Sequence, residues 1–157
     1  MDDLEATQRQ LVGNEALSWI GTRYHHQGRI KAKPGDPGGT DCGQFIYMTF
    51  FNVGLIPEMP NEYYTADWHL HRDLEVYMGI VQRFCREMDP SEPMLPGDIV
   101  LYKIARVHAH GAIVAPSGWP NVVHALKDAQ RVQEDLVTAG RLANRPQRHF
   151  SFWGRTE

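Results

Sequence analysis

Residues 40–51 read TDCGQFIYMTFF, a stretch in which a polar cap precedes an almost wholly apolar run. Either Thr40 or Asp41 can cap a helix, and the apolar run predicts that this helix is buried in the centre of the domain, with Gly54 placed to end it. The cap puts Cys42 in the first helical turn, where unpaired backbone N–H groups and the helix dipole favour an anion. We therefore expect a lowered pKa for the Cys42 thiol, which would make this cysteine a nucleophile rather than part of the core.

The composition indicates a globular chain. Of 157 residues, 42% are hydrophobic and 22% charged, which fits one domain spanning residues 1–157. The formal net charge is −3 without a long run of Lys or Arg, so we expect no nucleic-acid partner. The start MDDLEATQRQ is acidic and no stretch approaches the roughly 18 apolar residues of a membrane span, so we expect no signal peptide, no membrane contact and a chain that is cytoplasmic as synthesised. Cys42 and Cys85 form no zinc or redox motif and are expected to be free thiols.

Three further segments surround the buried helix. Helical spacing of apolar residues predicts an amphipathic helix over residues 3–20, although Gly13 within it is unfavourable by roughly 1 kcal/mol relative to alanine. Its apolar positions are Leu4, Leu11, Val12, Ala16 and Ile20. Residues 21–40 hold five glycines and two prolines, which predicts a long loop with a functional role. A surface helix is expected over residues 73–88, with Cys85 on its packed face.

The second half of the sequence changes to short β-rich runs separated by turn-forming residues. These runs are IVLYKI (99–104), HGAIVA (110–115), NVVHAL (121–126), RVQEDLV (131–137) and HFSFWG (149–154). Helices followed by a run of strands predict an α+β fold, in which N-terminal helices pack on a C-terminal antiparallel β-sheet.

A nucleophilic cysteine also needs a base and donors for an oxyanion. We favour His110, in VHAHGAIV, as the base, because a histidine at the start of a central strand is held rigidly. His108 lies two residues earlier and is expected on the same face of the strand, so periodicity alone does not choose between them. His124, in NVVHAL, can lie on a neighbouring antiparallel strand and orient the imidazole of His110.

Five segments carry a family resemblance. Together, ALSWIGTRYHHQG, TDCGQFIYMTFFNVGL, PGDIVLYK, HGAIV and VVHAL resemble the NlpC family of papain-like cell-wall cysteine peptidases, and most of all its phage-associated members. The resemblance spans residues 16–136 and keeps the family's order of tyrosine, cysteine, histidine and polar residue. It implies a single papain-like domain that needs no cofactor and hydrolyses peptide bonds in the stem peptides of bacterial peptidoglycan.

The resemblance also implies roles for individual residues. Cys42 would be the nucleophile, His110 the general base and acid, and His124 the third member of the triad. The hydroxyl of Tyr24 would lie near the oxyanion. The sequence departs from the family at TDCGQ, where many members have Ser or Ala followed by Gly, and at Arg23, which replaces a common proline; both changes bear on specificity. The expected lack of a secretion signal and of wall-binding repeats departs from exported members and suits either a phage tail component or an effector delivered to the cell wall by other means. Peptidoglycan peptides are therefore the expected partners, with phage tail proteins as further partners in the first case.

Five residues are expected to contact substrate. Asp41 and Gly43 flank the cysteine, and His108 precedes the favoured base. Tyr64 and Trp68 belong to EYYTADWHLH, an aromatic segment that can line a substrate groove or pin a loop to the core.

Metal chemistry finds little support in the sequence. Histidine pairs occur within residues 25–26, 69–71 and 108–110, but no HExxH or paired CxxC accompanies them. A zinc site needs three or four ligands at recognisable spacing, so we expect no metal site.

Two alternatives to a peptidase remain open. A phage-tail subunit can keep this fold as a catalytically silent structural or binding module. The same cysteine and histidine chemistry can also serve an amidase or an acyltransferase.

Overall fold

The computed structural model describes residues 1–65 and 75–154 and is organised around helix α2, Cys42–Asn52. Asp41 is its N-cap, and the Asp41 carboxylate accepts a hydrogen bond from the Gln44 backbone N–H at 2.9 Å. The apolar residues of α2 are mostly buried, and Gly54 follows the helix with φ 78°. The prediction of a capped, buried central helix is therefore confirmed.

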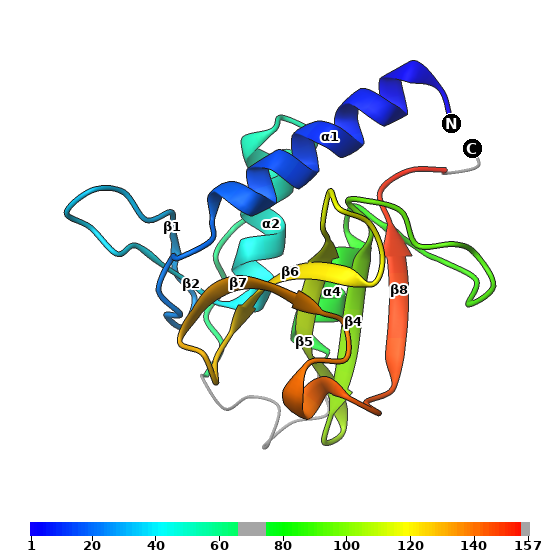
Figure 1. Ribbon diagram of the computed structural model, residues 1–157. Helices are drawn as coiled ribbons and strands as arrows, with labels where there is room; N and C mark the ends of the chain where they lie inside the picture. The colour runs from blue at the N-terminus through cyan, green and yellow to red at the C-terminus, as the bar shows by residue number, and fades with distance from the viewer. Residues whose placement is uncertain (66–74, 155–157) are drawn as a thin grey trace.

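Six strands form one antiparallel sheet with the order β3-β8-β4-β5-β6-β7. Figure 1 shows the run from β8 through β4, β5 and β6 to β7. Their bounds are β3 Arg86–Glu87, β4 Ile99–Ile104, β5 Val107–Val114, β6 Asn121–Leu126, β7 Arg131–Leu136 and β8 Gln147–Ser151. The predicted sheet is confirmed, although β8 lies two residues earlier than expected at its start and the short edge strand β3 was not predicted. A 3-10 turn, Gly140–Leu142, joins β7 to the approach of β8.

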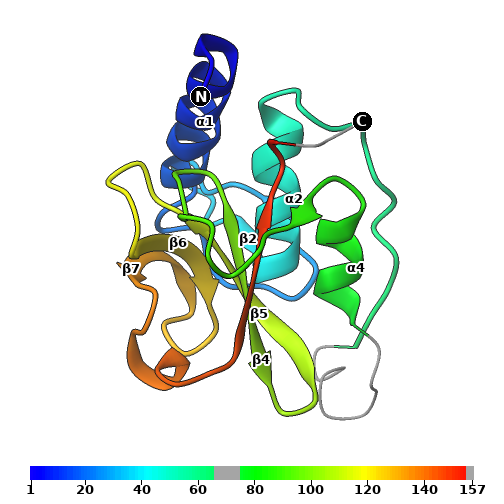
Figure 2. The same cartoon turned by 90° about the vertical axis from the view of Figure 1, so that its right-hand side faces the viewer.

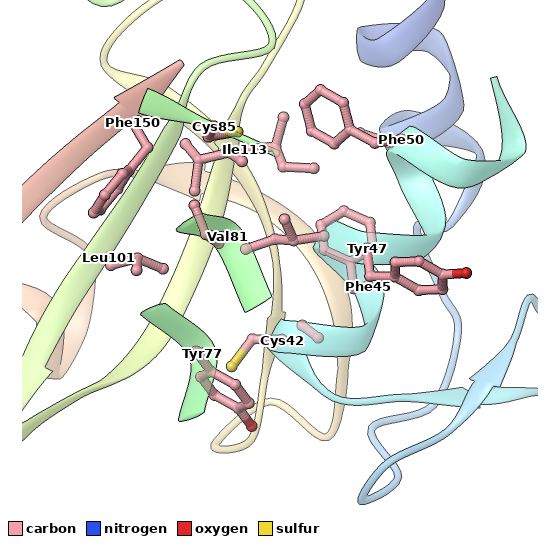
Figure 3. Close-up of a cluster of buried hydrophobic side chains, with 14 of the residues drawn as sticks. Cys42, Phe45, Tyr47, Phe50, Tyr77, Val81, Cys85, Leu101, Ile113 and Phe150 are labelled. Atoms are coloured by element: carbon pink, nitrogen blue, oxygen red, sulfur yellow. The ribbon is translucent and has the colours of Figure 1, made fainter. Parts of the chain in front are cut away.

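Helices α1 (Asp3–Ser18), α2 and α4 (Val76–Gln82) pack on one face of this sheet, with α2 and α4 side by side against β5 (Figure 2). The main core lies between these helices and the sheet (Figure 3). A second apolar cluster covers the opposite face and includes Met88, Met94, Val137 and Leu142. The α+β arrangement of helices on an antiparallel sheet is confirmed.

The first helix runs unbroken through Gly13, but only part of its predicted apolar side is buried. Val12 and Ala16 are buried as expected, whereas Leu4, Leu11 and Ile20 are exposed. Arg9 is also buried and pairs with Asp98 at 2.9 Å. Gly13 is required by close packing, because a Cβ there would lie 2.7 Å from Cγ of Pro116. The spacing of apolar residues predicted the helix, and its buried side also carries an arginine that pairs with the aspartate just before β4.

Two segments differ from their predictions. The long loop contains a two-stranded antiparallel ribbon, β1 (Arg29–Ile30) and β2 (Gly39–Thr40). The predicted surface helix is shorter, as α4, because the chain turns after it to enter β3; its first two predicted residues, 73 and 74, lie outside the described residues. Cys85 is buried as expected, and in the described part of the chain neither cysteine is in a disulfide. Within the described part of the chain, no helix is long and apolar enough to span a membrane.

Candidate active site

Cys42 lies where the first turn of α2 meets strand β5 and helix α4. Its sulfur donates a weak hydrogen bond to the carbonyl oxygen of Ala109 at 3.8 Å, and the backbone N–H of Gly111 also reaches it. Figure 3 shows the ring of Tyr77, from α4, directly beside the Cys42 side chain. The cysteine is only 2% exposed, but it lines a cavity of about 740 Å³ together with Tyr24 and His110.

A β-bulge in β5 determines on which face of the sheet each of its two histidines lies. In the ladder with β4, Tyr102 pairs with His110 and Lys103 with His108, so Ala109 is an extra residue without a partner. Successive residues of β4 face opposite sides, and the bulge therefore places His108 and His110 on opposite faces of the sheet. The expectation that both share one face is wrong.

His110 and His124 lie together, as the sequence predicts. Nε2 of His110 is 2.9 Å from Nδ1 of His124, and Nε2 of His124 is 2.8 Å from Oδ2 of Asp135. Burial lowers the pKa of His110 well below its usual value, with the neighbouring His124 adding to the effect. Burial also lowers the pKa of His124, against the opposing influence of Asp135. Both imidazoles are therefore neutral at neutral pH.

The expected lowering of the thiol pKa is wrong for this structure. Burial, and to a smaller extent the nearby carboxylate of Asp41, raise the pKa of Cys42 to about 12. Hydrogen bonds from Tyr77 and from backbone N–H groups oppose this change but do not cancel it. The packing that holds the sulfur at the helix start also removes it from water, so the resting pair is a neutral thiol and a neutral imidazole.

Two tyrosines lie close to the sulfur. Tyr24 lines the cavity, and burial raises its pKa, which keeps its hydroxyl protonated and able to donate. The Tyr77 hydroxyl lies within hydrogen-bonding reach of both the Tyr24 hydroxyl and the Cys42 sulfur. Sequence analysis did not identify Tyr77, because 34 intervening positions separate it from the cysteine.

Gly43 explains how Tyr77 approaches so closely. A Cβ at this position would lie 2.4 Å from Cδ1 and 2.6 Å from Cε1 of the Tyr77 ring. Only a glycine leaves room for the ring against the first turn of α2. The departure from Ser or Ala after the cysteine therefore coincides with the tyrosine packed there.

Four of the residues expected to contact substrate lie in the described part of the chain. Asp41 is fully buried, and its Oδ2 accepts from the Tyr64 hydroxyl at 2.5 Å and from the Gln27 backbone N–H at 2.9 Å. His108 lies 3.1 Å from a carboxylate oxygen of Glu75 through its Nδ1. Neither these residues nor Gly43 line the Cys42 cavity, and Tyr64 lines a separate cavity of about 320 Å³. Trp68 lies outside the described residues.

The Cys42 cavity also carries charge. Lys127, from the β6–β7 turn, and Arg141 and Arg145, from the segment between β7 and β8, line it together with Asp128. Asp128 pairs with Arg141 at 3.2 Å. Asp135 lines the same cavity and was not identified from the sequence. Across residues 1–65 and 75–154, no three His, Cys, Asp or Glu side chains are grouped to hold a metal ion.

One family model and several solved structures are similar to this chain. A model of the NlpC/P60 family matches residues 21–148. Similar solved structures include the peptidoglycan hydrolase RipB of Mycobacterium tuberculosis, with a TM-score of 0.62 and 17% identity over 99% of this chain and 70% of that one. The P60 domain of an antigen from Mycobacterium avium subspecies paratuberculosis gives 0.61 and 14%, over 95% and 97% of the two chains. The NlpC/P60 domain of the peptidoglycan hydrolase SagA gives 0.53 and 18%, over 89% and 96%.

Identities this low show a shared fold alone, and no curated protein matches the sequence. The family model, in contrast, covers most of the chain. The protein therefore has the papain-like α+β fold and belongs to the NlpC/P60 family.

Proposed function

We propose that this protein is a cysteine peptidase that hydrolyses peptide bonds in the stem peptides of bacterial peptidoglycan. The observation that carries the proposal is the cavity lined by Cys42, Tyr24 and His110, with His124 hydrogen-bonded behind His110. A thiol, an imidazole and a neutral hydroxyl at one cavity are the groups that acyl transfer requires.

The proposed reaction starts from the neutral pair. His110 accepts the thiol proton as the Cys42 sulfur attacks the peptide carbonyl carbon, and the Cys42 backbone N–H and the Tyr24 hydroxyl stabilise the oxyanion. When the tetrahedral intermediate collapses, the C–N bond breaks and protonated His110 gives its proton to the leaving amine. Water, deprotonated by His110, then attacks the thioester, which releases the acid and restores the thiol.

The substrate class is supported by the family and by the charges around the cavity. Two of the structurally similar proteins are named peptidoglycan hydrolases. Lys127 and Arg145 line the cavity as cations, and stem peptides carry free carboxylates that such cations attract. A role in a phage tail stays a prediction, because it rests on the sequence resemblance alone.

Incubation with purified muropeptides tests the proposal. Wild type is expected to release products with a new amine and a new carboxylate, detected by mass spectrometry, and Cys42→Ala is expected to release none. Cys85→Ala is the matched control, because it removes the other buried thiol away from the cavity.

The same assay separates the alternatives. Products joined to an added amine, in place of the hydrolysed acid, would identify an acyltransferase. Equal turnover by wild type and Cys42→Ala would reject the nucleophile. Intact muropeptides with every variant would favour a catalytically silent module.

A further inference from the structure

His124 stands between two polar side chains on the sheet face opposite the helices. Its Nδ1 lies 2.9 Å from Nε2 of His110, and its Nε2 lies 2.8 Å from Oδ2 of Asp135. The His124 side chain is fully buried, so its ring nitrogens depend on these partners rather than on water. Gln133 donates from Nε2 to the same Asp135 oxygen at 2.6 Å and holds the carboxylate in place.

The hydrogen bonds fix where the protons lie. A carboxylate can only accept, so His124 must carry its proton on Nε2 to bond to Asp135. A neutral imidazole carries one ring proton, which makes Nδ1 of His124 an acceptor. His110 must then donate from Nε2, and its Nδ1 is left without a proton.

The β6–β7 hairpin builds this arrangement. Its register pairs His124 with Gln133 and Val122 with Asp135, and paired residues share a face of the sheet. Asp135 is therefore the diagonal neighbour of His124 on the face that carries His110.

We propose that Asp135 is a positioning residue that acts on His110 through His124. It fixes the His110 proton on Nε2 and leaves Nδ1 free to accept the Cys42 proton. That Nδ1 of His110 accepts the Cys42 proton rests on the proposed function. The placement of the ring protons on Nε2 of His110 and Nε2 of His124 does not.

A competing role for Asp135 is substrate binding. Its side chain is 24% exposed and lines the cavity, where a carboxylate can pair with a cationic group of a ligand. The two roles differ in kinetics, because loss of a positioning residue lowers kcat, while loss of a uniform binding contact raises KM.

The first test needs no turnover. Long-range proton–nitrogen NMR correlations on histidine-labelled protein at neutral pH show which ring nitrogen is protonated, with His124→Gln used for assignment. Wild type is expected to carry the proton on Nε2 in both His110 and His124. Asp135→Ala is expected to give mixed protonation sites, and Asp135→Asn, which keeps the shape of the side chain, serves if the alanine variant does not fold. A wild-type proton on Nδ1 of His124, or unchanged spectra in both variants, overturns the proposal.

The second test is muropeptide cleavage. Loss of Asp135 is expected to lower kcat by about 10-fold to 100-fold, the range seen for groups that orient metal-bound imidazoles, with KM unchanged. Glu134→Gln is the matched control, because this neighbouring carboxylate faces the other side of β7 and accepts from Ser117 at 3.0 Å. A rise in KM with kcat retained assigns Asp135 to substrate binding and overturns positioning. If wild type itself cleaves nothing, the proposed function fails and the NMR result still decides the proton order.

Discussion

Replacing Gly43 with alanine forces the first turn of α2 against the ring of Tyr77. The new Cβ would lie 2.4 Å from Cδ1 of that ring, whereas non-bonded carbon atoms in contact are ~3.5–4.0 Å apart. The ring must therefore move by about 1 Å, although Tyr77 is buried in the core. Overpacking of this kind destabilises by about 1–3 kcal/mol, and the better helix propensity of alanine returns about 1 kcal/mol. The net loss is thus between about 0 and 2 kcal/mol.

Gly79→Ala provides the matched control. Gly79 lies inside α4, and no described atom is within 4 Å of its added Cβ. The gain in helix propensity is common to both variants, so the difference between their unfolding free energies in urea isolates the clash. We expect Gly79→Ala to match or exceed wild type and Gly43→Ala to fall about 1–3 kcal/mol below Gly79→Ala. Equal stabilities would refute the close packing of Tyr77 on the helix start.

Buried titratable groups carry the other predictions. Burial and the neighbouring His124 hold the pKa of His110 well below 6.5, so the acid limb of kcat/KM for muropeptide cleavage is expected below pH 6.5, and a limb at or above that value would contradict it. Folding lowers the pKa values of both histidines, so the unfolded chain takes up protons at a higher pH than the folded chain. The unfolding free energy should therefore fall as pH drops through 6.5, and it should fall less steeply in His124→Gln. The Tyr77 hydrogen bond lowers the pKa of Cys42, so Tyr77→Phe should slow its alkylation by iodoacetamide at fixed pH, and an unchanged rate would exclude that bond. Asp98→Ala breaks the buried ion pair with the arginine of α1 and should lower the unfolding free energy by about 3–5 kcal/mol; a loss under about 1 kcal/mol, typical of exposed pairs, would show that burial adds nothing.

The parts of the fold predicted from the sequence are those with local signals. Asp41 before an apolar run marked the start of α2, and β-branched runs between turns gave strands β4 and β6 with their observed bounds. The early end of α4 and the edge strand β3 were missed. Strand β3 exists because it pairs with β8, more than 60 residues away, and such a pairing leaves no trace in local periodicity.

The site, like the fold, has residues that local sequence signals predict and residues that they do not. The order of Cys42, His110 and His124 along the chain predicted that they share a site. Nothing in VHAHGAIV, however, indicates that Ala109 forms a bulge. Asp135 could have been predicted from the sequence, because the register of a short hairpin sets the diagonal neighbours of His124. Tyr77 could not have been predicted, since its contact with the cysteine depends on how α4 packs against α2.

The thiol pKa shows why a local argument can give the wrong sign. The helix start favours a thiolate by a limited amount, which falls off within one turn, while burial acts on the whole sulfur and is the largest influence on Cys42. In the proposed mechanism, the thiol proton therefore moves to His110 only as the sulfur forms its bond to the carbonyl carbon. A neutral buried thiol is also a poor target for oxidants, which react with exposed thiolates. If the proposed mechanism holds, the packing that keeps the thiol neutral in the free protein also restricts formation of the anion to the moment when a substrate fills the cavity.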